Sequence, residues 1–169
     1  SGIGIVPRGL KLGGANCKPG DKVIVSGTLG DHGITIMSCR ESLSFTTDVQ
    51  SDAAPLNHLI ADTLEATGSY DSEAASPVRC FRDPTRGGLA STLNELAAQS
   101  NVDIEIEEDA IPVRPSVLGA CEMLGYDVLQ VANEGKMVCI VAPEAADAAL
   151  EAMKASPYGK DAAIIGEVS

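Results

Sequence analysis

The sequence predicts an α+β domain in which helices cover a mixed β-sheet. Continuous apolar runs such as 23–25 and 137–142 are typical of buried strands. The stretch 54–66 instead repeats its apolar residues at helical spacing. The chain has 169 residues, enough for one domain, with no Trp and only 3% aromatic residues. A core of Val, Ile, Leu and Ala suits helices packed on a sheet.

The order of the elements follows from periodicity and from turn residues. Strands are expected at 23–25, 78–81, 102–106, 137–142 and 162–168. Helices are expected at 29–40, 54–66, 89–99, 116–124 and 144–155. Polar connections are expected at 41–52 and 68–77. Strands and helices are interleaved, but not as a regular series of βαβ units.

The charge and the cysteines restrict the class of protein. The net charge is −12, and such a surface repels nucleic acid and anionic lipid, so neither is expected as a partner. No apolar run approaches the ~18 residues that span a bilayer. Five cysteines without C-x-x-C spacing disfavour a disulfide framework or a zinc site and fit a cytoplasmic location. Cys39, Cys80, Cys121 and Cys139 have apolar neighbours and are expected to be buried.

Two segments share the pattern of a strand, a glycine-rich loop and the start of a helix. The first motif is 26–33 (SGTLGDHG) and the second is 82–88 (RDPTRGG). Free N–H groups at a helix N-terminus favour anions, so each loop is a candidate for binding phosphate or a carboxylate. The alternative is structural, with Asp31 or Thr85 capping a helix. Neither loop is a Walker A motif or a dinucleotide-binding fingerprint.

The second motif is the more unusual of the two. It places Arg82, Asp83 and Arg86 beside two glycines, and packing alone does not explain charges at such a turn. Two arginines can neutralise a polyphosphate. A local Arg–Asp ion pair is an equally good explanation on the residues alone.

The third motif is 132–136 (ANEGK), which lies directly before the apolar strand 137–142. An acid and an amine at this position can form a proton-transfer pair. The residues alone favour a polar turn, in which Asn and Gly supply the backbone angles. The two histidines, His32 and His58, are too few for a metal site, and no metal ligand is assigned in this chain. His32 either contacts a ligand or packs within its loop, and His58 is expected at the surface.

Taken in order, the three motifs resemble the HypE family of hydrogenase maturation proteins. Supporting matches are 5–9 (IVPRG) and 159–168 (GKDAAIIGEV). The resemblance covers nearly the whole chain, and the combination is specific although each piece alone is weak. HypE proteins belong to the AIR synthase-related (PurM-like) superfamily. The resemblance therefore implies a PurM-like C-terminal domain, here a single domain over residues 1–169.

The resemblance also implies an activity, an ATP-dependent carbamoyl dehydratase. In this family ATP, with Mg²⁺, phosphorylates the oxygen of a carbamoyl group carried on the enzyme's own C-terminal cysteine. Loss of phosphate and a proton leaves a thiocyanate, which supplies the cyanide ligands of NiFe hydrogenases. The implied partners are the carbamoyltransferase HypF, the HypC–HypD scaffold and, in the full-length protein, a second copy in a homodimer.

Site residues follow from the same resemblance. Glu134 matches a family glutamate near the thiocarboxamide and is expected to be the catalytic proton acceptor. Asn133 and Lys136 flank it and are expected to orient the substrate. The residues expected to face the nucleotide cleft are Arg82, Asp83, Thr85, Arg86, Gly87 and Gly88, together with Gly30, Asp31 and His32 of the first motif.

This chain departs from the family pattern in three places, one of which is the missing catalytic lysine that the family has shortly before the position of Ser1. The Asp-rich N-terminal domain that binds ATP and Mg²⁺ is absent, and so is the terminal Pro-Arg-Ile-Cys tail. The chain is therefore expected to be a fragment that is inactive alone. Two alternatives are the C-terminal domain of another PurM-like enzyme, such as one resembling selenophosphate synthetase, and a non-catalytic docking module for maturation proteins.

Overall fold

The computed structural model describes residues 5–40, 51–71 and 75–169, so most of the expected loop 41–52 and part of the connection 68–77 lie outside the described residues. Every expected strand and helix is present, with ends that differ by a few residues. The strands are β1 (Lys22–Val25), β2 (Val78–Arg82), β3 (Ile104–Ile106), β4 (Val138–Val141) and β5 (Ala163–Val168). The helices are α1 (Asp31–Arg40), α2 (Asn57–Ala66), α3 (Gly88–Ser100), α4 (Pro115–Leu124) and α5 (Ala146–Ala155). Short 3-10 turns lie at Glu108–Ala110, Val128–Gln130 and Pro143–Ala145.

The α+β class is confirmed, but the strand directions differ from the expected mixture. The sheet order is β2-β4-β1-β5-β3, and all four pairs of these described strands are antiparallel. The reason is that β1, β2 and β3 run one way and β4 and β5 the other, and no two strands consecutive in sequence are neighbours. β4 and β5, for example, lie on either side of β1. Strands that run the same way are therefore separated in the sheet by a strand of opposite direction, and every neighbouring pair is antiparallel.

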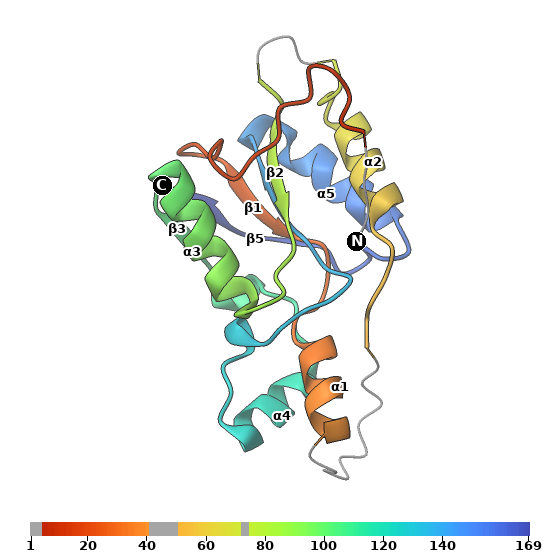
Figure 1. Ribbon diagram of the computed structural model, residues 1–169, viewed down its shortest axis with the longest axis vertical. Helices are drawn as coiled ribbons and strands as arrows, with labels where there is room; N and C mark the ends of the chain where they lie inside the picture. The colour runs from red at the N-terminus through yellow and green to blue at the C-terminus, as the bar shows by residue number, and fades with distance from the viewer. Residues whose placement is uncertain (1–4, 41–50, 72–74) are drawn as a thin grey trace.

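Helices cover both faces of the sheet (Figure 1). Val23 and Val25 of β1 point to the face covered by α3, where they pack with Leu89 and Leu93. Ile24 points to the other face, which α2 and α5 cover. This alternation is the two-residue period of a strand buried on both sides, and it explains why the core strands read as continuous apolar runs.

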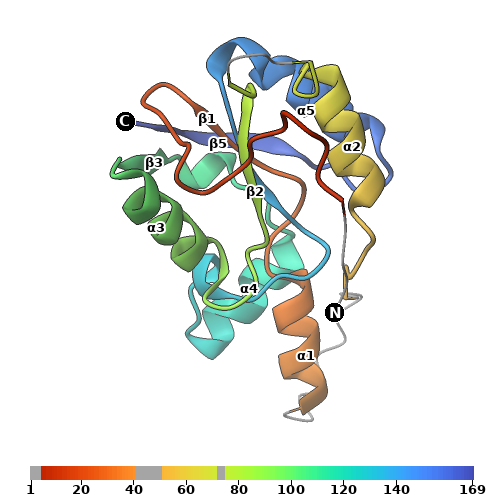
Figure 2. The ribbon, with the colours of Figure 1, turned by 45° about the horizontal axis from the view of Figure 1, so that its top comes forward.

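A smaller cluster joins α1 to α4 beyond the end of the sheet (Figure 2). Ile34 is fully buried there against Val117 and Cys121. The prediction that Cys39 is buried is wrong, because its side chain is exposed. Five residues along a helix correspond to a rotation of about 140°, which takes Cys39 to the face opposite Ile34.

The other predicted thiols are buried as expected, since Cys80, Cys121 and Cys139 are each at most 3% exposed. Burial raises the pKa of the Cys139 thiol, so it stays protonated. Cys17 is also buried, and a hydrogen bond from the Cys80 thiol lowers the pKa of Cys17 to about 6. In the described part of the chain, no helix has the length and apolar character needed to cross a membrane.

Candidate functional site

The three motifs meet around the side chain of Asn133, which is completely buried. Its Oδ1 accepts a hydrogen bond from the backbone N–H of Gly30 at 2.7 Å. Its Nδ2 donates to the carbonyl oxygens of Pro84, at 3.2 Å, and Val131, at 2.9 Å. The backbone N–H of Asn133 also donates to Pro84, at 3.1 Å. One amide therefore connects all three motifs, and both its acceptor and its donor groups are occupied by the protein itself.

The second motif approaches this centre closely because it contains two consecutive glycines. Gly88 has φ = 61°, and a Cβ there would lie 2.7 Å from the carbonyl oxygen of Val131. Only glycine fits such a position. Gly87, with φ = 72°, precedes α3 as its N-cap, and no side chain caps the helix. Thr85 is thus not the cap that the structural alternative required; its hydroxyl donates to Asp83 at 3.1 Å.

The acid of the first motif points inward. Asp31 is fully buried in the first turn of α1, where it accepts a hydrogen bond from the Thr28 hydroxyl. Its other oxygen lies 3.3 Å from Nε of Arg114. The segment before α4 reaches this loop because Leu29 donates to the carbonyl of Pro112 at 2.9 Å. Asp31 therefore holds Arg114 beside the first motif and is not itself open to a ligand.

His32 lies next to a pocket of about 560 Å³ between α1 and the segment after α4. Its ring is half-buried, and Nδ1 lies 2.9 Å from the Ser51 hydroxyl. Ile36, Met37 and Tyr126 supply apolar wall to the same pocket. His32 thus lines a pocket while the Asp31 carboxylate is buried, so neighbours within one motif face different spaces.

Glu134 is exposed, and no partner contacts its carboxylate among the described residues. The backbone on either side of it is fixed. Asn133 is buried, and Gly135, with φ = 63°, packs so closely that a Cβ would lie 2.5 Å from the amide nitrogen of Ala54. Lys136 then forms a 2.6 Å ion pair with Asp52, both side chains being 11% exposed. Glu134 is therefore a free carboxylate on a rigid turn.

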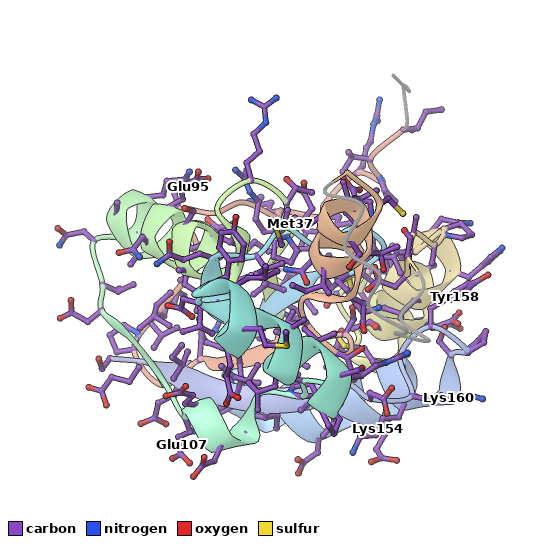
Figure 3. The ribbon with its side chains drawn as sticks, turned by 90° about the horizontal axis from the view of Figure 1, so that it is seen from below. Met37, Glu95, Glu107, Lys154, Tyr158 and Lys160 are labelled. Carbon is purple, nitrogen blue, oxygen red and sulfur yellow. The ribbon has the colours of Figure 1, made fainter. Side chains whose placement is uncertain are left out.

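The arginines of the second motif differ from each other. Arg82 forms a 2.5 Å ion pair with Glu95 of α3, which Figure 3 labels, and both side chains are about half exposed. Arg86 is exposed and has no partner in the described part of the chain. The alternative explanation, a local ion pair between Asp83 and one of these arginines, is therefore not observed among the described residues. The motif presents one free guanidinium to solvent, beside a glycine turn that is fixed by its packing.

Sequence reasoning missed Asp52 and Arg114, the charged partners of Lys136 and Asp31. Arg114 stands between Val113 and Pro115, and a proline on the following residue favours the extended conformation observed at Arg114, with ψ = 140°. The sequence feature that could have indicated Arg114 is a charged residue at a helix start, with Pro112 two residues before it and Pro115 directly after it. Within the described ranges, no three His, Cys, Asp or Glu side chains gather as a metal site would require.

The sequence matches the family described as AIR synthase related protein, C-terminal domain, over residues 18–169. The chain belongs to this family. It is also 55% identical to the carbamoyl dehydratase HypE of Bradyrhizobium diazoefficiens, over 99% of this chain and 46% of that protein. The chain therefore spans about half the length of the curated relatives it matches.

Solved structures with the same fold include HypE from a HypE–HypF complex. It has a TM-score of 0.86 and 48% identity, and the match covers 94% of this chain and 49% of that one. A structure of HypE in complex with ATP matches with a TM-score of 0.84 and 46% identity, over 93% of this chain and 44% of that one. The resemblance on which the sequence reasoning relied is thereby confirmed.

Proposed function

We propose that this chain is the C-terminal domain of an ATP-dependent carbamoyl dehydratase that makes the cyanide ligands of NiFe hydrogenase, and that Glu134 is its proton acceptor. The similarity to HypE proteins along nearly the whole chain supports the family of reactions. The observation that carries the role of Glu134 is its geometry. It is an unpaired carboxylate between two residues whose positions are fixed, Asn133 and Gly135.

This geometry suits general-base catalysis. A base contributes most when it is held in place before the substrate arrives. Here the buried amide of Asn133 and the close packing of Gly135 fix the backbone, so only the Glu134 side chain has to adjust. Asn133 acts in this proposal by positioning its neighbour, because its own amide is occupied by backbone groups.

The proposed reaction balances with ATP as the only co-reactant. The carbamoyl oxygen on the terminal cysteine attacks the γ-phosphorus, and ADP leaves. The nitrogen then forms the C≡N bond as the C–O bond breaks and inorganic phosphate departs. The two amide protons are lost in these steps: Glu134 accepts one and passes it to solvent, and the other leaves on the inorganic phosphate. The net change is a carbamoyl group and ATP giving a thiocyanate, ADP, hydrogen phosphate and a proton.

The second motif is proposed to face the nucleotide. A solved HypE binds ATP, and here Arg86 offers an unpaired guanidinium to phosphate oxygens. Thr85, Gly87 and Gly88 fix the loop, while Arg82 is held by Glu95. The described residues supply no cluster suited to Mg²⁺, so no step is assigned to that ion in this chain.

The remaining parts of the proposal concern other domains and proteins. A HypE–HypF complex is among the structures similar to this chain, which supports HypF as the carbamoyl donor. The HypC–HypD scaffold as cyanide acceptor, and a homodimer of the full-length protein, are proposed from the family resemblance. Because the chain covers 46% of the HypE relative that it matches, residues 1–169 alone are expected to have no dehydratase activity.

The test uses the full-length protein carbamoylated at its terminal cysteine. Adding ATP should convert the carbamoyl group to thiocyanate, which mass spectrometry detects as a loss of 18 Da, about the mass of one water, expected from general-base dehydration. Glu134→Gln should slow this step by about 10²–10⁴-fold. Glu151→Gln, at an exposed position of α5, is the matched control and should keep the parental rate.

Full turnover by folded Glu134→Gln protein would contradict its assigned role. Absence of any mass change in the parental full-length protein would contradict the dehydratase assignment itself.

A further inference from the structure

A second pocket lies between the first and third motifs, with a volume of about 410 Å³. Its walls come from five separate parts of the chain, one of which is the stretch 51–54. Gly27 and Thr28 belong to the first motif and Lys136 to the third, while Arg114 comes from the start of α4. Tyr158 and Lys160 follow α5 and lie close together on one side of the molecule (Figure 3).

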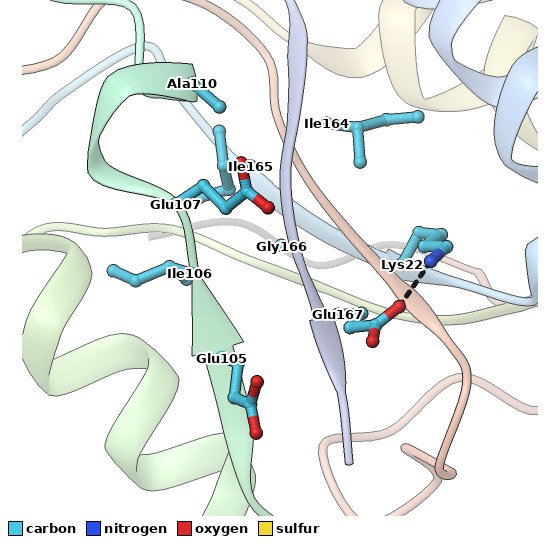
Figure 4. Close-up of a pocket in the computed structure, with 9 residues that line it drawn as sticks. All are labelled: Lys22, Glu105, Ile106, Glu107, Ala110, Ile164, Ile165, Gly166 and Glu167. Atoms are coloured by element: carbon cyan, nitrogen blue, oxygen red, sulfur yellow. Dashed lines mark hydrogen bonds and ion pairs between the residues drawn. The ribbon is translucent and has the colours of Figure 1, made fainter.

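The pocket contains three cations, Arg114, Lys136 and Lys160, and two carboxylates, Asp52 and Asp161. This balance is unusual for a chain whose net charge is −12. Another pocket of similar size, about 360 Å³, is lined by residues of the paired strands β3 and β5 and shows the opposite balance (Figure 4). It is lined by Glu105, Glu107 and Glu167, with Lys22 as its one cation. Anions are thus favoured in one pocket and repelled by the other.

Arg114 is held in place by one nitrogen of its guanidinium, and no residue that the structure describes occupies its other donors. The Nε atom lies 3.3 Å from the buried carboxylate of Asp31, which orients the guanidinium plane. No interaction occupies the two Nη groups among the described residues. Half of the side chain is exposed, so these donors are accessible. Such a fork of free donors matches two oxygens of a phosphate or carboxylate.

Lys136 is positioned in the same manner. Its ammonium pairs with Asp52 at 2.6 Å, while the side chain is 11% exposed. An ammonium has three donors, so this pair leaves others available. Gly27 makes the space for the lysine, because a Cβ at Gly27 would lie 3.1 Å from Lys136 Cε. Each cation is therefore fixed by a carboxylate and still has hydrogens to donate.

We propose that Arg114 and Lys136 form a subsite for a single oxyanion, a phosphate or a carboxylate group of a ligand bound beside the turn 132–136 that carries Glu134. Lys160 adds charge at the exposed rim. Which molecule carries the oxyanion rests on the proposed function. The subsite itself rests on the pocket alone, and anion binding is measured without any turnover.

The experiment follows backbone amides of Gly27, Thr28 and Gly135 by NMR while the chain is titrated with inorganic phosphate or, separately, acetate. Sodium chloride at matched ionic strength is the control for screening. Saturable shifts with Kd of about 1 mM are expected for at least one anion. Preference for phosphate would assign the group to a nucleotide or phosphorylated substrate, and preference for acetate would assign it to a carboxylate.

Arg114→Gln should weaken the binding by about 10-fold or more, the loss expected for one charge-assisted pair. Arg114→Lys keeps a cation beside Asp31 and so protects the fold, but it lacks the fork and should also weaken binding several-fold. Lys22→Gln is the matched control, since Lys22 is an ion-paired lysine beside the acidic pocket. It should leave the titration unchanged.

Two results would overturn the proposal. One is the absence of saturable shifts with either anion beyond those caused by chloride. The other is binding that folded Arg114→Gln or Arg114→Lys protein retains at parental affinity. Neither result bears on Glu134, whose role is measured by turnover in the full-length protein.

Discussion

The two glycine-rich loops have the same design in sequence and different surroundings in space. In the first, Asp31 is fully buried and Gly30 donates to Asn133. In the second, the charged residues Arg82, Asp83 and Arg86 are all exposed, while Pro84 and Gly88 are buried. The first loop uses its polar side chain to build the domain, whereas the second uses its backbone for that and leaves its side chains to solvent.

The difference shows that a strand–glycine–helix pattern does not by itself determine what binds there. A charge buried and paired inside a protein is a structural element, because removing its partner leaves it uncompensated. An exposed charge contributes little to stability and is available to a ligand. Substitutions in the two loops should therefore separate stability from binding.

The largest effect should come from breaking the connection between the loops. Asn133→Ala leaves the buried Gly30 N–H without its acceptor and removes the side-chain donor to the carbonyls of Pro84 and Val131, which should lower the free energy of unfolding by about 3 kcal/mol. Urea denaturation measures this. Asn94→Ala is the control, because exposed Asn94 bonds only within α3, and it should cost less than about 0.5 kcal/mol. Equal losses in both variants would mean that Asn133 does not join the motifs.

The stability of the second loop should depend on its glycine backbone, and so on having no side chain at Gly88. Gly88→Ala places a methyl group against the carbonyl of Val131 at positive φ, and should cost about 2 kcal/mol in unfolding free energy. Gly119 of α4 has open space around it, so Gly119→Ala should instead stabilise by up to about 1 kcal/mol. A neutral Gly88→Ala would show that the loop does not need its close approach.

Replacing the acid of the first loop should destabilise the domain more than replacing the acid of the second. Asp31→Asn removes the charge that orients Arg114 and should cost about 1–2 kcal/mol of unfolding free energy. Asp83→Asn, at an exposed position that accepts only from Thr85, should cost less than about 0.5 kcal/mol. Thermal unfolding of the two proteins compares them directly. The comparison between the loops fails if Asp83→Asn is the more destabilising change.

The smallest effect on stability should come from Arg86→Ala, within about 0.5 kcal/mol, because Arg86 is exposed and unpaired. In the full-length protein the same change should weaken ATP binding by about 10-fold, as loss of a charge-assisted contact to phosphate does. Calorimetry with ATP measures this, and Asn94→Ala, at an exposed position of neighbouring α3, provides a control. Unchanged ATP affinity would remove Arg86 from the proposed nucleotide contacts.

The sequence was sufficient for the secondary structure and insufficient for the contacts between motifs. Apolar periodicity located β1, α2 and β4 because these elements are buried in regular patterns. It could not reveal that backbone groups occupy the side-chain amide of Asn133. Those hydrogen bonds depend on how loops that are distant in sequence pack together. Glu134 and Arg86 are as exposed as a binding role requires, but the resemblance, and not the spacing, singled out Glu134.

The order of the strands has a consequence for how the chain reaches its fold. Strands consecutive in sequence are never neighbours in the described sheet, so no hairpin is available as a local nucleus. β1 pairs only with β4 and β5, and β3 pairs only with β5, the last strand. High contact order of this kind slows folding. During synthesis β1 therefore has no partner until β4 has left the ribosome, and a nascent chain halted before Ala163 leaves the edges of β1 and β3 that pair with β5 exposed to aggregation.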